Sequence, residues 1–442
     1  MTGLDPRPVG RRIAAIRARS SSAVLLSSLA LVMAKVATMG FGFLAWVTAA
    51  RLYPAADVGV AAGAVAAVTL CAQLALVGVG SAVITLLPLH LPRPSRLLDT
   101  SVTLLVLTSA GVGLLFLLFA GTVLQELQVV AADPAYAVMF LLLAVAGTLG
   151  VLFDQVSTAR RRGDQALLRG LAAGVVTLVA VVALGWTAAG LEGSQGIFLA
   201  WVMGGVMTMV LGFWTMTRAV VGYRPSLNLD QVMARELVRV GLPNWVLTVT
   251  ERAPGFVLPI VVIELLSPAD NAVWYAAWMM SWVVFVVPIQ VGMTSFAEIA
   301  RRPAESRNIV SNGITTSLGL GIVGAIGLAV LAEPLLGLLG VEYAAAGVLP
   351  LRILLLGIVP ITLIQAYFSV CRARQALGEA IAIGAGSSIA SIVLPAMAGV
   401  AAGLPAMALA WLGVQSVTAV VAAFRLRREV FAAASQGTVP AS

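Results

Sequence analysis

Two hydrophobic stretches of this chain carry charged side chains where a bilayer would normally exclude them. Lys35 lies within 23–50. The adjacent residues Glu251 and Arg252 lie within 241–266. Charged side chains at membrane depth are costly, and they usually mark the path of a substrate or an ion. Arginine suits bidentate contact with phosphate, and lysine provides a compact point charge. These residues therefore predict a cationic site for an anionic head group.

The composition explains why such stretches would cross a membrane. Of the 442 residues, 60% are hydrophobic and 10% are charged, a balance that a water-facing surface cannot accommodate at this length. A spanning helix needs about 20 apolar residues, so helices and short connections consume most of the chain. The hydropathy pattern predicts twelve transmembrane helices, and no segment remains for a separate soluble domain.

The charges of the connections predict the orientation of these helices. Most of the 27 basic residues fall in alternate connections, as the excess of arginine and lysine in cytoplasmic loops requires. Both termini are therefore expected in the cytoplasm. The net charge of +8 is spread over many loops, which argues against a nucleic-acid-binding surface. The high ratio of arginine to lysine and the abundance of alanine suggest a GC-rich bacterial genome. The expected location is therefore the cytoplasmic membrane of a bacterium.

The chain also contains a weak internal repeat. The segment 51–59, RLYPAADVG, matches 265–273 when Pro54 is aligned with Pro268. Each half holds six predicted spans, so the two halves share one orientation and are related by an axis along the membrane normal. We expect two pseudo-symmetric six-helix bundles around a central cavity. The predicted divisions are a cytoplasmic segment 1–22, a first bundle 23–217, a cytoplasmic linker 218–240, a second bundle 241–424 and a cytoplasmic tail 425–442.

The same motifs resemble those of the polysaccharide and oligosaccharide-lipid flippases of the multidrug, oligosaccharidyl-lipid and polysaccharide (MOP) exporter superfamily. The resemblance rests on RLYPAADVG at 51–59, LVGVG at 76–80 and SVCRAR at 369–374. It implies a V-shaped cavity lined by spans one, two, seven and eight. The function implied is the translocation of a polyprenyl-(di)phosphate-linked oligosaccharide for cell-surface polysaccharide assembly. A polysaccharide polymerase or glycosyltransferases would then be partners, together with membrane lipids.

The candidate substrate-binding residues are charged, polar or aromatic residues of the predicted spans, and each has a structural alternative. Lys35 and Glu251 alternatively form an ion pair between the halves, while Arg51 and Arg352 alternatively reach toward lipid head groups. Glu251 alternatively carries a coupling proton. Tryptophan and tyrosine commonly anchor membrane interfaces. The full candidate set is Lys35, Arg51, Asn244, Trp245, Glu251, Arg252, Tyr275, Arg352 and Gln365.

Two other function classes compete with a flippase. A cation-coupled multidrug exporter of the same superfamily would need intramembrane acids, whereas Glu251 is the only acid well inside a predicted span. A membrane enzyme would need an acid–base or nucleotide-binding constellation on a substantial loop. The sequence shows no nucleotide-binding or metal-ligand motif, so we expect no catalytic residue, metal or cofactor.

Overall fold

The computed structural model describes residues 38–90, 94–160, 162–187, 193–219 and 223–428. These residues form helices joined by turns and irregular connections, with no strand among them. The first half begins with the helix 38–52. It continues with α2 (Ala55–Ala75), α3 (Val79–Leu86), α4 (Pro94–Val123), α5 (Gln128–Ala132), α6 (Pro134–Ala159), α7 (Gly163–Thr187) and α8 (Ser194–Ala219).

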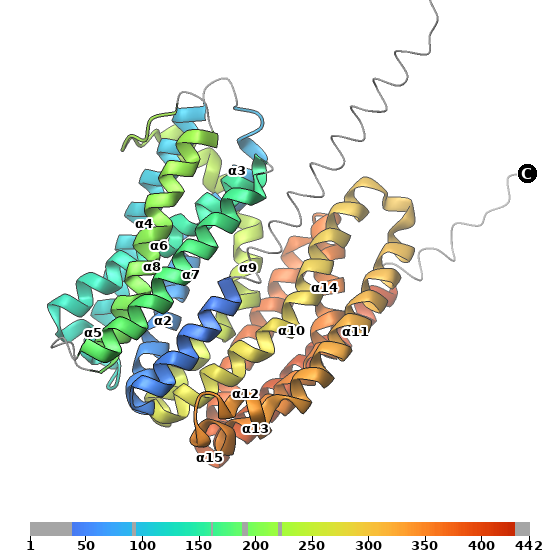
Figure 1. Ribbon diagram of the computed structural model, residues 1–442. Coiled ribbons are helices and arrows are strands. Elements are labelled where there is room, and N and C mark those ends of the chain that lie inside the picture. Colours follow the sequence, from blue (N-terminus) through green and yellow to red (C-terminus); the bar gives the residue numbers. More distant parts are fainter. Residues whose placement is uncertain (1–37, 91–93, 161, 188–192, 220–222, 429–442) are drawn as a thin grey trace, which may run out of the picture.

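The second half begins with two helices of 35 and 34 residues, α9 (Gln231–Leu265) and α10 (Pro268–Arg301). The remaining elements are η1 (Pro303–Glu305), α11 (Ser306–Val330), α12 (Ala332–Gly337), α13 (Val341–Leu355), α14 (Ile358–Ala373) and α15 (Leu377–Leu426). Figure 1 shows two groups of helices, the blue-to-green first half and the yellow-to-red second half, which converge near α12 and α13.

The helices account for the twelve predicted spans. In the described ranges, nine helices are long and apolar enough to cross a membrane, and the bent pair α13 and α14 makes a tenth span. The α15 helix holds two spans, because its backbone is non-helical at Ala402 and Gly403. The helix 38–52 is the described part of the first predicted span. The prediction of an all-α polytopic membrane protein is therefore confirmed.

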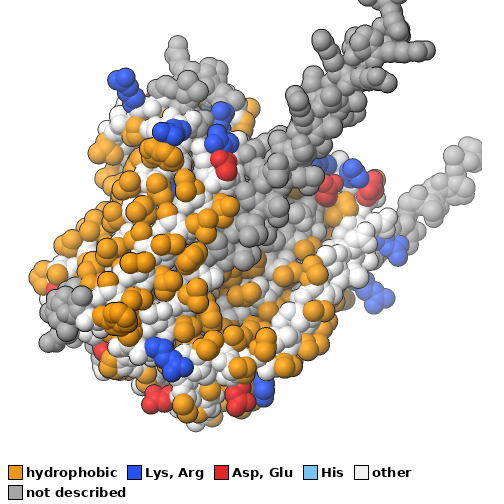
Figure 2. Space-filling view, viewed as in Figure 1, with side chains coloured by type: hydrophobic (Ala, Val, Ile, Leu, Met, Phe, Trp, Pro, Cys, Tyr) orange, Lys and Arg blue, Asp and Glu red, His pale blue; other side chains and the backbone are white. Residues whose placement is uncertain are grey.

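Side-chain types are distributed as a bilayer requires. Hydrophobic side chains cover the flank visible in Figure 2, and the charged side chains gather toward its two ends. We call the end that carries the connection 223–230 the inner end, because the sequence predicts it to be cytoplasmic. The opposite end, which carries α5 and α12, is the outer end. Neither of these short helices was predicted.

The connection between the halves is fixed to the first half at the inner end. The buried carboxylate of Asp99 accepts hydrogen bonds from the Tyr223 hydroxyl (2.8 Å) and from the backbone and hydroxyl of Ser226 (3.0 and 2.7 Å). Asp230 then caps α9 by accepting from two backbone N–H groups, and it pairs with Arg96. The N–H of Met233 is the main cause that holds the pKa of Asp230 below its ordinary value.

Among the described residues, the buried hydrophobic side chains form one cluster at the outer end and two at the inner end. The outer cluster contains residues of both halves, among them Phe140 and Trp274. At the inner end, one cluster surrounds Leu98 of the first half, and a separate cluster surrounds Tyr367 of the second. Apart from α9, whose inner segment packs into the cluster around Leu98, the two halves share a hydrophobic core only toward the outer end.

The α9 helix contributes to all three clusters in the order of its sequence. Met233 and Leu237 pack with the first half, whereas Leu247 packs with the inner cluster of the second half. Leu258 then enters the shared outer cluster. The helix also approaches the first half closely at Gly241, where an added Cβ would lie 1.8 Å from the carbonyl oxygen of Gly78. Hence α9 bridges the two halves along its whole length.

The contact of α2 with α10 at the outer end tests this arrangement. A Cβ added at Gly59 would lie 1.7 Å from the carbonyl oxygen of Pro268, which is backbone and cannot rotate away. We expect Gly59→Ala to lower the free energy of unfolding in detergent by about 1–3 kcal/mol through overpacking. Gly413→Ala is the matched control, because no heavy atom lies within 4 Å of its added Cβ. Equal stability of the two variants would contradict the close packing.

Candidate functional site

The predicted pair Glu251 and Arg252 lies in the middle third of α9, and the structure adds Arg372 of α14 to it. The Arg372 guanidinium is 2.8 Å from the Glu251 carboxylate. Only 7% of the Arg372 side chain and 13% of the Glu251 side chain are exposed. An ion pair this well covered is maintained only if both charges have close partners. One oxygen of the Glu251 carboxylate, Oε2, is thus engaged by Arg372, whereas Oε1 is buried without a hydrogen-bond partner among the described residues.

Arg252 is half-buried beside this ion pair. Glu251 attracts its charge and Arg372 repels it. Within the part of the chain that the structure describes, no hydrogen bond or ion pair is made by its guanidinium. The group of Glu251, Arg252 and Arg372, which we call the central charge cluster, therefore has two cations and one anion. Its net positive charge is suited to an anionic ligand.

Prolines of α9 shape the backbone around the central charge cluster. Pro243, Pro254 and Pro259 lie inside the helix. Each removes one backbone N–H donor and leaves a carbonyl of the preceding turn without its helical partner. Pro254 does so for the carbonyl of Thr250, next to Glu251. The cluster is therefore held on a helix that can bend on either side of it.

Two aromatic candidates make contacts between the halves. The indole N–H of Trp245 donates to the carbonyl of Gln73 at 2.8 Å. The ring of Tyr275 meets that of Trp46 at a centroid distance of 5.1 Å and nearly edge to face. These contacts position α9 and α10 against the first half. The role of both rings in binding a substrate stays a prediction.

The two polar candidates lie on α9 and α14. Asn244 is half-buried on α9, two turns before Arg252. Gln365 is buried on α14, where its backbone oxygen lies 3.3 Å from a Cβ added at Gly292 of α10. The described contacts place Gln365 inside the second half. Binding by either amide stays a prediction.

Arg51 and Arg352 lie toward the outer end and bond the carbonyl ends of helices. Arg51 donates to the carbonyls of Leu338 (2.6 Å) and Gly337 (2.8 Å). Arg352 is exposed and donates to the carbonyl of Ala329 at 3.2 Å. A cation at a helix C-terminus is favourable because the carbonyls there carry partial negative charge. The structure does not bring either arginine into the central charge cluster.

Lys35 lies outside the described residues, so its predicted pairing and its predicted contact with substrate both stay predictions. The structure shows a different partner for Glu251, which is Arg372. Sequence reasoning assigned Arg372 to an inner connection, because it follows the apolar run of span ten. The sequence did contain a signal for this pairing, because a lone carboxylate inside a span, such as that of Glu251, needs a nearby cation.

A second buried arginine was also assigned to an inner connection. Arg169 is 2% exposed and lies 2.9 Å from the carboxylate of Asp154. It also donates to the hydroxyls of Ser157 and Thr215 at 3.0 and 3.1 Å. These partners all belong to the first half. The arrangement therefore ties α6, α7 and α8 together rather than facing the second half.

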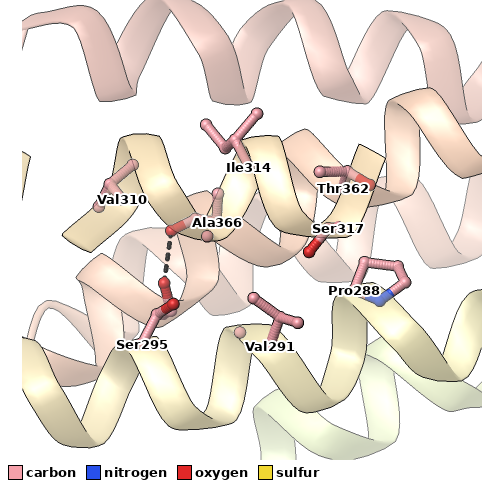
Figure 3. Close-up of a pocket in the computed structure, with 11 residues that line it drawn as sticks. Pro288, Val291, Ser295, Val310, Ile314, Ser317, Thr362 and Ala366 are labelled. Carbon is pink, nitrogen blue, oxygen red and sulfur yellow. Dashed lines mark hydrogen bonds between the residues drawn. The ribbon is translucent and has the colours of Figure 1, made fainter. Parts of the chain in front are cut away.

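Figure 3 shows a small pocket within the second half, between α10, α11 and α14. Its lining is neutral and includes the hydroxyl groups of Ser295, Ser317 and Thr362. Ser369, which also lines it, donates to the carbonyl of Ala366 at 2.7 Å. This pocket contains no charge that would select an ion. Across the described ranges, no group of three histidine, cysteine, aspartate or glutamate side chains is placed to bind a metal.

Comparison with known proteins gives matches in structure only. No protein-family model and no curated protein matches the chain. A multidrug resistance MATE family transporter of the MOP superfamily, in its inward-facing conformation, matches with a TM-score of 0.68 and 14% identity, covering 93% of this chain and all of that one. The fold is therefore that of the MOP superfamily transporters.

Two further solved structures share this fold. The lipid II flippase MurJ, in an inward closed conformation, matches with a TM-score of 0.63 and 12% identity over 91% of this chain and 87% of that one. A MOP superfamily transporter from Pyrococcus furiosus, described by the reverse polarity of its binding pocket, gives 0.59 and 14% over 93% and 96%. At these identities the likeness concerns the fold.

The ion pair of the central charge cluster can be tested without a substrate. We expect Arg372→Met to destabilise the protein by about 3 kcal/mol or more, because Glu251 is left buried without its partner. The double variant Arg372→Met with Glu251→Gln should recover most of that loss. The measurement is the free energy of unfolding in detergent.

Arg425→Met is the matched control for this experiment. Arg425 also pairs with a glutamate, Glu379 at 3.1 Å, but both side chains are exposed by a third or more. An exposed pair contributes about 0–1 kcal/mol. A loss in Arg372→Met no larger than in this control would show that the central ion pair is not a buried one.

Proposed function

We propose that this protein is a flippase that moves a polyprenyl-(di)phosphate-linked oligosaccharide across the cytoplasmic membrane of a bacterium. The observation that carries the proposal is the guanidinium of Arg252, which has no described hydrogen-bond or ion-pair partner beside the ion pair of Glu251 and Arg372. Lys35, placed by the sequence in the first span, would add a second cation from the other half. The carried head group is anionic, and these cations would replace water around it.

The physical step is solvent substitution rather than chemical conversion. A phosphate loses its hydration when it enters a region of low dielectric constant, and an isolated ion there is strongly disfavoured. A fixed guanidinium offers two parallel N–H donors to phosphate oxygens and so offsets this loss. The sugar would remain in a wet space between the halves, and the polyprenyl tail would remain in lipid. Translocation then requires that the space open to each side in turn.

The structural neighbours support a transporter without selecting its substrate. MurJ is a lipid II flippase, which makes a lipid-linked sugar a natural cargo for this fold. The MATE family transporter of the same fold is a multidrug resistance transporter. The polarity of the binding pocket was taken to suggest a different function for the Pyrococcus furiosus transporter. Polarity is therefore the property by which we choose between the two classes.

A cation-coupled multidrug exporter is the alternative, favoured by the structural likeness to MATE transporters. Such a protein would use an intramembrane carboxylate to bind a cationic drug or a coupling ion. Here the carboxylate of Glu251 is already paired with Arg372, and Arg252 stands beside it. A cationic drug would meet net repulsion at this place.

The proposed orientation has both termini in the cytoplasm. The lipid-linked sugar would be supplied by glycosyltransferases on that side and consumed by a polysaccharide polymerase on the other. Consumption of the product, an ion gradient or the membrane potential would drive the direction of transport.

Transport in proteoliposomes tests the proposal. A polyprenyl-diphosphate-linked disaccharide is placed in one leaflet, and its arrival in the other is measured with a membrane-impermeant lectin. We expect Arg252→Ala and Lys35→Ala each to slow transport at least about tenfold, the factor of one charge-assisted hydrogen bond. Arg252→Lys should retain part of the rate because it keeps the positive charge.

Arg425→Ala is the control, since Arg425 lies in an exposed ion pair near the end of α15. Undiminished transport of the lipid-linked sugar in both Arg252→Ala and Lys35→Ala would overturn the assignment of the site. Efflux of a cationic dye that depends on Glu251, with no movement of the lipid-linked sugar, would favour the multidrug exporter.

A further inference from the structure

Two charged side chains at the outer end each reach from one half of the molecule to the backbone of the other. Arg51 ends the first span, in the first half, and donates to the carbonyls of Gly337 and Leu338 in the second half. Glu264 ends α9, in the second half. Its carboxylate accepts from three consecutive backbone N–H groups of the first half, those of Gln125, Glu126 and Leu127, at 2.6, 3.2 and 2.9 Å.

These two contacts correspond to each other in the internal repeat. When Pro54 is aligned with Pro268, Arg51 falls beside Glu264, one position apart. The carbonyls bonded by Arg51 end α12, the short helix between α11 and α13. The N–H groups bonded by Glu264 precede α5, the short helix between α4 and α6. Each half therefore offers one charged side chain and receives one, at equivalent places.

Other contacts at the same end show that the halves meet there directly. The side-chain amide of Asn271 in α10 donates to the carbonyl of Gly59 in α2 at 2.8 Å. The backbones of Gly59 and Pro268 are in close contact. At the inner end, in contrast, only α9 joins the halves, and the other described helices of the two halves keep separate hydrophobic clusters. The outer end is thus the closed end of this conformation.

We infer that Arg51 and Glu264 form a reciprocal latch that holds the outer end closed and must release before it can open. Separation of the halves at this end breaks both contacts together, since each joins the two halves. Both partner groups are backbone, so the latch depends on the two side chains alone. The contacts are partly exposed, and each is expected to bias the equilibrium moderately.

Distance measurement between the halves tests the latch. Spin labels are placed at Val129 of α5 and Val341 of α13, which are exposed and belong to different halves. The background has Cys71 and Cys371, both buried, replaced by alanine. Pulsed electron paramagnetic resonance on the full chain then gives the closed and open populations at the outer end. No substrate is needed, so a wrong substrate assignment leaves this test intact.

We expect Arg51→Gln and Glu264→Ala each to raise the ratio of open to closed populations about threefold or more, the factor expected for one charge at an exposed helix end. The double variant should show about the product of the two factors, because both contacts act on one two-state equilibrium. Glu264→Gln, which keeps the size of the side chain, provides a second variant if Glu264→Ala does not fold.

The matched controls alter side chains that form the same kinds of hydrogen bond to backbone groups, but within their own half. Arg352→Gln removes an arginine that donates to the carbonyl of Ala329. Asp133→Asn alters a carboxylate that accepts from the N–H groups of Ala135 and Tyr136. Unchanged distances in the latch variants, or an equal shift in these controls, would overturn the latch.

Discussion

The arrangement of this protein depends on the pairing of one carboxylate at membrane depth. Glu251 is nearly covered, so its carboxylate would be costly to bury without an oppositely charged partner, and Arg372 supplies that partner at 2.8 Å. The pair fixes α9 to α14 within the second half. Arg252, the next residue on α9, makes no hydrogen bond or ion pair within the described residues, although Oε1 of Glu251 is also without a hydrogen-bond partner there. Because the pair of Glu251 and Arg372 carries no net charge, the charge of Arg252 remains as the local excess.

This constraint acts through a helix that belongs to both halves. The inner segment of α9 packs against the first half, its middle carries the central charge cluster, and its last turns enter the shared outer core. Any change in the angle between the halves must therefore bend α9 or detach one of its segments. Three internal prolines weaken the helix between these contacts. The central charge cluster thus lies on the part of α9 that would have to bend when the angle between the halves changes.

The sequence predicts the spans and the placement of Glu251 and Arg252 well, because long apolar runs and intramembrane charges are local signals. It does not predict the partner of Glu251. Arg372 follows an apolar run just as other inner-end arginines do, and only the fold shows that its side chain turns back among the helices. The short helices α5 and α12 were missed for a related reason. Each holds too few residues for a periodic pattern, and their capping by Glu264 and Arg51 involves residues more than a hundred positions away.

The internal repeat gives both halves the same topology, yet the charges at equivalent places differ in sign. At the outer end this difference has a physical cause. The end of the first span meets the last carbonyls of α12, whereas the end of α9 meets the first N–H groups before α5. Carbonyl groups at a helix end favour a cation, and N–H groups favour an anion. A duplicated contact can therefore persist between the halves only if the side chain changes with the polarity of the backbone it meets. Arg51 and Glu264 satisfy that condition, so the symmetry is one of position and not of residue type.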